Sequence, residues 1–179
     1  MSNSEFTLYG DITEESAGRL VHAIQSSDAQ KSILHLSSAG GSTFGGLSIV
    51  GAIAYEQQKY SVEFICRITG VCMSAAVAVA AQCNIVECNR DAQFMVHQSR
   101  IKLNSNMSTA EIRSEANYLS GLDQAFTDII LRRAKNGLGR MMQAKTEGGH
   151  DWNFDAETAK HYGIVDNIWG FTPKQSEQK

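Results

Sequence analysis

The sequence predicts an α/β protein built on a largely parallel β-sheet. Short apolar stretches with the length of strands alternate with stretches whose apolar residues recur at helical spacing, as in crossover connections between parallel strands. Polar or glycine-containing turns follow several of the strands. The 179 residues, 42% of them hydrophobic and 20% charged, suffice for one compact domain, 1–179, with a sizeable core.

In the first part of the chain, predicted strands and helices alternate. We expect strands over residues 6–9, 33–36 and 62–69. Thr13 can cap a first helix, whose first turn carries Glu14 and Glu15. The second strand runs into a turn with Gly40 and Gly41, where glycine permits backbone angles that other residues resist, and a second helix follows. This turn could direct an N–H toward a substrate oxygen, or it could be a plain tight turn.

Ser74 opens an alanine-rich helix shortly after the third predicted strand, which Gly70 is expected to close. A hydroxyl at such a strand-to-helix turn is exposed and lies near backbone N–H groups that can stabilise developing negative charge. A lone serine in such a run more often hydrogen-bonds to a nearby carbonyl inside the core. Ser74 is therefore a candidate nucleophile only if a base lies beside it.

His97 is the candidate base. Two further strands are predicted over residues 84–87 and 92–97, and the second is apolar up to His97. Because ligands of open parallel sheets gather beyond the carboxyl ends of the strands, we expect Gly41, Ser74 and His97 to meet at one edge. Histidine suits general-base chemistry since its pKa lies near neutral pH, and a carboxylate must then fix its tautomer.

The local sequence offers several carboxylates for that task. Asp155 is better explained as the cap of a short helix that ends at Gly163, and Asp166 as a turn residue at a strand end. Asp151 remains, in a stretch predicted to be a loop before that helix and a last strand. No local role accounts for it.

A long amphipathic helix is predicted over about residues 104–135. Ser108 and Glu111 can form a capping box at its start, and apolar residues recur along it at helical spacing. Such a stripe can pack within the chain or against another subunit. The stretch 134–149 that follows is polar and contains glycine.

Charge and composition argue against several classes of partner. The formal charge is −3, and lysine and arginine are scattered, so neither nucleic acid nor an anionic membrane surface is indicated. No signal-peptide pattern is visible and the longest apolar run, 75–81, is too short to span a bilayer, so we expect a cytoplasmic protein. The four cysteines lack metal-ligand spacing and are expected to be reduced, mostly buried thiols rather than a zinc site.

Taken together, the motifs resemble those of the Clp protease proteolytic subunit (ClpP) family of the ClpP/crotonase superfamily. Residues 37–41 resemble the family's N-S-P-G-G turn, 70–76 the segment around its nucleophile, 95–98 its M-I-H-Q, and 156–166 its A-x-E-A-x-x-Y-G-L-V-D ending. In order and approximate spacing, the resemblance covers about residues 6–170 and indicates a divergent member. It implies a ClpP/crotonase-like fold of repeated β-β-α units, with about 104–135 as a protruding handle helix and about 172–179 as a flexible tail.

The resemblance also implies a site and a reaction. Ser74 would be the nucleophile, His97 the general base and Asp151 the orienting carboxylate. The backbone N–H groups of Gly41 and Ala75 would form the oxyanion hole. The implied activity is that of a serine endopeptidase, which hydrolyses unfolded or short polypeptides by acyl transfer and uses no cofactor and no metal.

The partners that the resemblance implies are polypeptide substrates, further copies of the chain in rings, possibly stacked around a chamber, and an AAA+ unfoldase. Few residues precede the first predicted strand, so we expect the family's N-terminal axial loop to be short or absent, which leaves docking of an unfoldase open. Gly149 and His150 depart from the charged pair that the family uses between rings, and Ala39 and Ser99 replace prolines of its motifs.

Two other functions stay open at this point. A non-catalytic ring or scaffold subunit is favoured if Asp151 points away from His97. A crotonase-type acyl-CoA enzyme would share the glycine-amide oxyanion hole, but it would not need Ser74 and His97 together.

Overall fold

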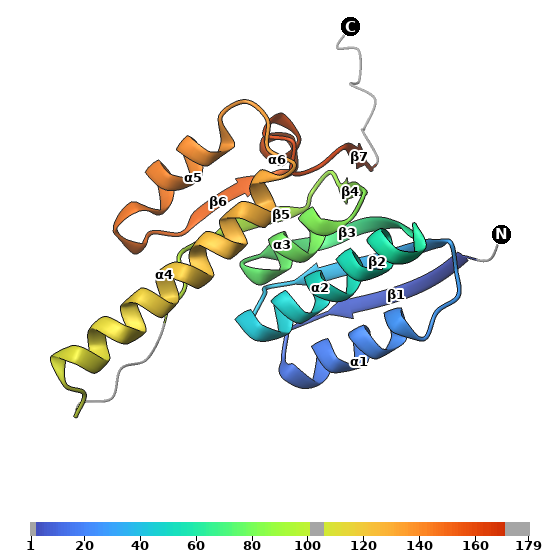
Figure 1. Cartoon of the computed structure of the whole chain (residues 1–179). Coiled ribbons are helices and arrows are strands. Elements are labelled where there is room, and N and C mark those ends of the chain that lie inside the picture. Colours follow the sequence, from blue (N-terminus) through green and yellow to red (C-terminus); the bar gives the residue numbers. More distant parts are fainter. Residues whose placement is uncertain (1–2, 101–105, 171–179) are drawn as a thin grey trace, which may run out of the picture.

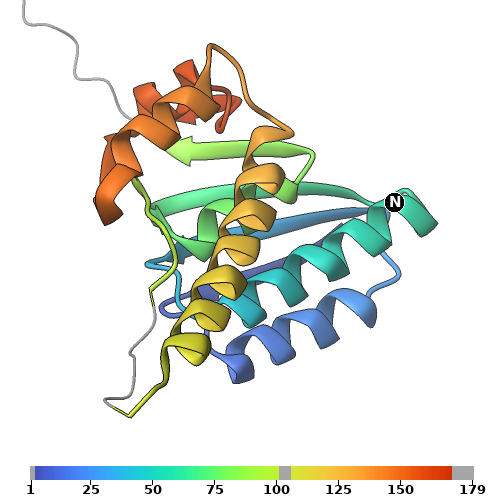
Figure 2. The same ribbon diagram turned by 60° about the vertical axis from the view of Figure 1, so that its left-hand side comes forward.

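The computed structural model describes residues 3–100 and 106–170. It is an α/β structure in which helices cover one face of a mostly parallel sheet, as Figure 1 and Figure 2 show from two sides. The strands are β1 (Asn3–Tyr9), β2 (Lys31–Ser38), β3 (Glu63–Met73), β4 (Ile85–Asn89), β5 (Gln93–Val96), β6 (Trp152–Asp155) and β7 (Asn167–Trp169). The helices are α1 (Glu14–Gln25), α2 (Thr43–Tyr60), α3 (Ala75–Gln82), α4 (Thr109–Leu131), α5 (Leu138–Thr146) and α6 (Ala156–His161), with a 3₁₀ turn at Glu147–Gly149. The predicted fold class is confirmed.

The sheet divides at β3. Parallel strands follow the order β1-β2-β3-β4-β7, and β4 pairs with the first half of β3. The second half of β3, from Val71 to Met73, pairs instead with β5, and β6 continues from β5 in the antiparallel sense. One long strand therefore connects the main sheet to the smaller ladder that carries the segment before His97.

Gly70 does not close the third strand as the sequence analysis predicted, because β3 continues to Met73. The Val71 N–H donates to the Ser37 Oγ at 3.3 Å, which keeps the chain against β2. A Cβ at position 70 would lie 2.8 Å from the same oxygen. Glycine at position 70 thus leaves room for the Ser37 side chain, whose hydrogen bond to Val71 lets β3 continue.

The predicted helix starts are confirmed. The Ser16 N–H donates to the Thr13 Oγ1 at 3.0 Å at the start of α1. Ser108 and Glu111 form the capping box of α4, and the Ser108 hydrogen bonds lower the pKa of the Glu111 carboxyl. Asp155 caps α6 by accepting the Thr158 N–H at 2.8 Å, which lowers the pKa of Asp155.

Two elements near the C-terminal end were not predicted. Helix α5 lies in the stretch expected only to be polar and glycine-containing, and its Leu138 and Met142 are buried. Strand β6 occupies most of the predicted loop. Buried and exposed side chains alternate over only these few residues: Trp152 and Phe154 are buried, while the residue after each is exposed. Phe154 stacks on Phe94 of β5 with ring centroids 5.5 Å apart. This cross-strand pairing, which is not a local sequence signal, makes the segment a strand.

Helix α4 runs across the helical layer, and its N-terminal part extends beyond the sheet in Figure 1. Only Ile129 and Ile130, close to its C-terminal end, are buried. Just after the helix, Arg133 donates to the Cys83 carbonyl at 2.5 Å and pairs with Asp166. The helix is thus anchored at one end and exposed at the other.

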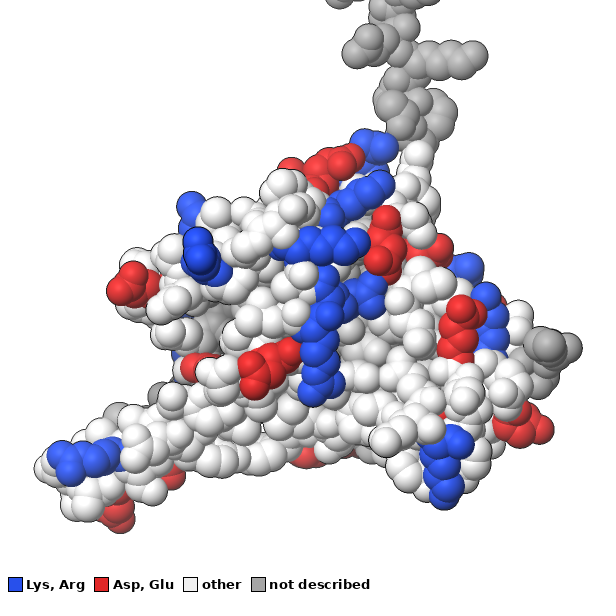
Figure 3. Space-filling view, turned by 45° about the horizontal axis from the view of Figure 1, so that its top comes forward, with Lys and Arg blue, Asp and Glu red and all other residues white. Residues whose placement is uncertain are grey.

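On the face drawn in Figure 3, basic side chains form a short band with acidic side chains beside it.

Helix α4 begins at Thr109, inside the predicted range, and residues 101–105 and the predicted tail at about 172–179 lie outside the described residues. Within 3–100 and 106–170, no helix combines the length and the apolar character needed to cross a membrane.

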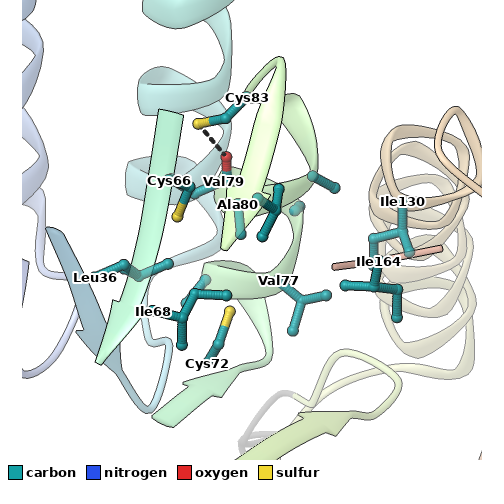
Figure 4. Packing of buried hydrophobic residues seen from close by; sticks show 14 of the residues in the cluster. Leu36, Cys66, Ile68, Cys72, Val77, Val79, Ala80, Cys83, Ile130 and Ile164 are labelled. Carbon is teal, nitrogen blue, oxygen red and sulfur yellow. Dashed lines mark hydrogen bonds between the residues drawn. The ribbon is translucent and has the colours of Figure 1, made fainter. Parts of the chain in front are cut away.

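The core lies between the sheet and the helices, and small side chains let α3 approach β3 closely. Residues 75–81 of α3 are all buried, and Figure 4 shows Val77 among Ile68, Cys72 and other apolar side chains. All four cysteines are buried free thiols, as expected. Burial raises the pKa of the Cys72 thiol, and it raises that of Cys88 to about 12.

This burial predicts slow thiol chemistry. At pH 8, the four thiols should react with a disulfide reagent such as DTNB only at the rate of unfolding, because the thiolate is the reactive form and each sulfur is shielded. Full reaction is expected immediately in guanidinium chloride. Rapid titration of one or more thiols in the native protein would contradict this packing.

Candidate active site

Ser74 occupies the turn between β3 and α3 in an unusual backbone conformation, with φ 54° and ψ −127°. Residues other than glycine rarely adopt a positive φ, at a cost of about 1–3 kcal/mol. The turn is held by the Ser74 N–H, which donates to the Met95 carbonyl of β5 at 2.8 Å. Ser74 is the N-cap of α3, yet its side chain makes no capping hydrogen bond. Its hydroxyl is therefore available to another partner.

That partner is His97, whose Nε2 lies 2.9 Å from the Ser74 Oγ. The approach follows from the strand pairing, since Met73 and Met95 are opposite each other in the parallel ladder of β3 and β5. Ser74 follows the first of these residues directly, and His97 comes just after the second. The structure thus brings together the serine and the histidine that the sequence analysis expected at one sheet edge.

The glycine turn lies beside this pair and is held from both sides. The Ser38 Oγ accepts the Gly40 N–H at 3.1 Å, the Ile12 N–H donates to the Gly40 carbonyl at 2.7 Å, and the Ser42 N–H donates to the Ile12 carbonyl at 2.6 Å. Gly41 has φ 135°, and a Cβ there would lie 2.4 Å from the Ile12 carbonyl oxygen. Only glycine fits this position.

The N–H groups of both candidate oxyanion-hole amides are free to bind a substrate oxygen. Within the described ranges, the N–H groups of Gly41 and Ala75 make no hydrogen bond to a backbone or side-chain acceptor. Ala75 is the first residue of α3, where helical N–H groups lack an intrahelical partner and the helix dipole favours negative charge. Gly41 and Ala75 also line the same cavity as Ser74 and His97.

This cavity has a volume of about 850 Å³ and opens to solvent. Besides the serine, the histidine and the two amides, it is lined by residues of the segment after β5, of α4 and of α5, including Gln98, Ser99, Phe126, Ile130, Met142 and Thr146. Both apolar and polar side chains thus line a space whose volume is large enough for several residues of a peptide. No cluster of His, Cys, Asp and Glu suited to a metal ion occurs in the described part of the chain.

Asp151 directly precedes β6, but its carboxylate has another partner than His97. The antiparallel ladder of β5 and β6 ends at the pair of Val96 and Trp152, and extending it by one step would bring His97 opposite Asp151. The Asp151 Oδ1, however, accepts a hydrogen bond from Arg100 Nη2 at 2.5 Å. The buried His97 Nδ1 finds no hydrogen-bond partner among the described residues. Such an unpaired buried nitrogen costs about 1–3 kcal/mol.

Sequence reasoning missed three features of this site. Arg100 was not recognised as a partner of Asp151, because the two residues are 51 positions apart in the sequence and neither forms a local motif. The Ser99 N–H donates to the Asp123 Oδ1 at 2.7 Å, which ties the segment after His97 to α4. The wall formed by α5 was missed together with that helix. The only local signal was the proximity of Arg100 to the candidate base.

Known proteins resemble the chain along almost its whole length. The sequence pattern of the family described as Clp protease matches residues 1–171. The chain belongs to the Clp protease family. A Clp protease proteolytic subunit described as ATP-dependent, from Cyanophora paradoxa, is 27% identical over 165 residues, 91% of this chain and 80% of the relative. A subunit of the same description from Carsonella ruddii is 25% identical over 164 residues, 90% of this chain and 81% of the relative.

A solved structure of a ClpP shares the fold. A mutant of ClpP1 from Listeria monocytogenes superposes with a TM-score of 0.77, covering 93% of this chain and 91% of that chain at 19% identity. The recognition of a divergent ClpP-family member, with a ClpP/crotonase-like fold, is therefore confirmed, and the family supports a peptidase. The roles of individual residues stay predictions.

The packing of the glycine turn predicts a sharp difference between two glycines. Gly41→Ala should lower the free energy of unfolding by about 2 kcal/mol or more, since the new methyl group meets the Ile12 carbonyl and alanine resists the positive φ. Gly51→Ala, on the exposed side of α2 with open space around it, should raise stability by about 0.5–1 kcal/mol. Urea denaturation measures both, and equal effects would refute the close approach at Gly41.

Proposed function

We propose that this protein is a serine endopeptidase of the cytoplasm that hydrolyses unfolded or short polypeptides. The observation that carries the proposal is the hydrogen bond of 2.9 Å between Ser74 Oγ and His97 Nε2 in a cavity lined by two unpaired backbone amides. A nucleophile within hydrogen-bond reach of a base is the arrangement that acyl transfer requires. The buried, reduced thiols fit a reducing compartment.

In the proposed reaction, His97 Nε2 takes the Ser74 proton while the Oγ attacks the carbonyl carbon of the scissile peptide bond. The resulting oxyanion accepts hydrogen bonds from the N–H groups of Gly41 and Ala75. His97 then gives the proton to the departing amine, and an acyl-enzyme remains on Ser74. A water molecule, deprotonated by His97, hydrolyses this ester and regenerates the serine.

Asp151 completes the proposed triad as the acceptor of the His97 Nδ1–H. A carboxylate there selects the tautomer that leaves Nε2 unprotonated, and it stabilises the imidazolium that forms during acylation. The ladder of β5 and β6 supports this role, because extending it by one step would bring His97 and Asp151 opposite each other. The side chain of Asp151 has to turn away from Arg100 to make it.

The contact between Asp151 and Arg100 is the one observation that favours the alternative of a non-catalytic ring or scaffold subunit. The hydrogen bond between Ser74 and His97 argues against it, as does the strained backbone at Ser74, since a purely structural serine gains nothing from either. A crotonase-type acyl-CoA enzyme would likewise have no use for this pair.

The proposal includes a homo-oligomeric chamber built from rings, possibly stacked. Helix α4 supports it, because most of its length is exposed in the single chain and its exposed residues include Ile112 and Tyr118. As the handle of the family, this helix would be covered by a neighbouring subunit. Docking of an AAA+ unfoldase remains an open part of the proposal.

Covalent labelling tests the nucleophile. A fluorophosphonate probe should attach to Ser74, and Ser74→Ala should abolish labelling and lower kcat for peptide cleavage by roughly 10⁴-fold or more. Ser48→Ala, on the exposed side of α2 and outside the cavity, serves as the matched control and should retain both properties. Peptide cleavage that survives Ser74→Ala would reject the serine-peptidase proposal.

Light scattering tests the chamber. The measured mass should be a large multiple of the 19.6 kDa chain and should persist on dilution into the micromolar range. Charge substitution of the exposed stripe, as in Ile112→Glu, should dissociate the assembly while the far-UV circular dichroism of the chain is retained. A mass of one chain at every concentration would contradict the proposed chamber.

A further inference from the structure

We propose that Arg100 is a positioning residue that competes with His97 for the carboxylate of Asp151 and thereby holds the site in a less active resting state. The inference rests on the proposed function, because it concerns how the triad is completed. The side chain of Asp151 has two arrangements, one bonded to Arg100 and one bonded to His97. Arg100 would control how often each is populated.

The first support is that Asp151 and His97 do not bond to each other in the way that the proposed triad requires. Val96 and Trp152 form the last pair of the ladder of β5 and β6, and one further step would bring His97 opposite Asp151. The Asp151 Oδ1 nevertheless accepts from Arg100 Nη2 at 2.5 Å. The His97 Nδ1 is buried and makes no hydrogen bond with any described residue. A histidine with one nitrogen on a serine hydroxyl and the other unpaired lacks the contact that fixes its tautomer. The same carboxylate would supply that contact.

The second support is that Arg100 is held where it can compete. Its Nη2 also donates to the Gly149 carbonyl at 3.1 Å, so the guanidinium bridges two residues of the segment that leads into β6. Gly149 has a positive φ of 80°, in a turn that brings its carbonyl toward the arginine side. A terminal guanidinium nitrogen carries two N–H donors, one for each of these acceptors.

The third support is the modest strength of this ion pair. The side chains of Arg100 and Asp151 are 59% and 39% exposed, so water and salt screen their attraction. The His97 Nδ1, in contrast, is buried, and a hydrogen bond there would be less screened. Because water and salt weaken the bond that holds Asp151 at Arg100, losing Arg100 shifts the population of Asp151 toward His97.

The stretch that follows β5 explains why Arg100 and His97 can compete for one carboxylate. Arg100 comes three residues after His97, on a stretch that is attached to α4 by the hydrogen bond of the Ser99 N–H to Asp123. Both Arg100 and His97 line the cavity that contains Ser74. Movement of this stretch on peptide binding would therefore act on Arg100 and on the site together.

The test compares Arg100→Met, which keeps a long side chain without donors, with Arg90→Met as the matched control. Arg90 forms a similarly exposed ion pair, with Glu157, but it does not line the cavity. Arg100→Met should raise kcat for a short peptide by about two- to fivefold with little change in KM, the range that loss of a half-exposed ion pair allows. Arg90→Met should leave kcat unchanged.

A second background isolates the route through Asp151. In Asp151→Asn, which is expected to be slow, adding Arg100→Met should give no further increase in kcat. An equal increase in both backgrounds, or a kcat that falls or stays constant in Arg100→Met alone, would overturn the proposal. Fluorophosphonate labelling of each variant reports separately whether Ser74 is a nucleophile, so failure of the proposed function is recognised as such.

A crystal structure of Arg100→Met provides a readout that does not depend on activity. The Asp151 carboxylate should lie within hydrogen-bond distance of His97 Nδ1 in the variant, and beside Arg100 in the unmodified protein. A carboxylate that stays turned away from His97 after the arginine is removed would refute the competition.

Discussion

The hydrogen bond from the Ser74 N–H to the Met95 carbonyl connects the parts of this molecule on which the site depends. It joins the end of β3 to β5 at the place where β3 has changed partners from β4. Because His97 follows β5 directly, this one contact sets where the histidine lies relative to the serine. It also sustains the positive φ of Ser74, which keeps its hydroxyl out of the N-terminal turn of α3 and available to His97.

The surrounding packing serves the same geometry. Small residues in α3 let this helix lie against β3, and the N–H of Ala75 lies in the cavity that the Ser74 hydroxyl also lines. The Ile12 backbone fixes the Gly41 turn on the other side. Gly41 and Ala75 offer backbone N–H groups, which are stiffer than side chains and suit the proposed oxyanion hole, since a developing charge is best stabilised by donors that need not reorganise. The carboxylate of Asp151, by contrast, belongs to a side chain that can bond to Arg100 or, as proposed, to His97.

Much of the fold could be predicted from the sequence, for identifiable reasons. The alternation of strands and helices, the caps at Thr13, Ser108 and Asp155, and the edge that joins Ser74 to His97 are all local or periodic signals. The continuation of β3 beyond Gly70 was missed because it depends on the side chain of Ser37, which belongs to a neighbouring strand. Strand β6 and the partner of Asp151 were missed for the same reason: cross-strand stacking on Phe94 and the reach of Arg100 exist only in the folded chain.

Formation of an acyl-enzyme on Ser74 is the central claim, and it can be observed directly. The protein should be mixed with an activated ester, quenched in acid within the first turnovers, and analysed by intact-mass and peptide mass spectrometry. A rapid burst of product is expected, with one acyl group per active chain, located on the peptide that contains Ser74. Turnover of the ester without an acylated chain, or with the acyl group on another residue, would contradict it.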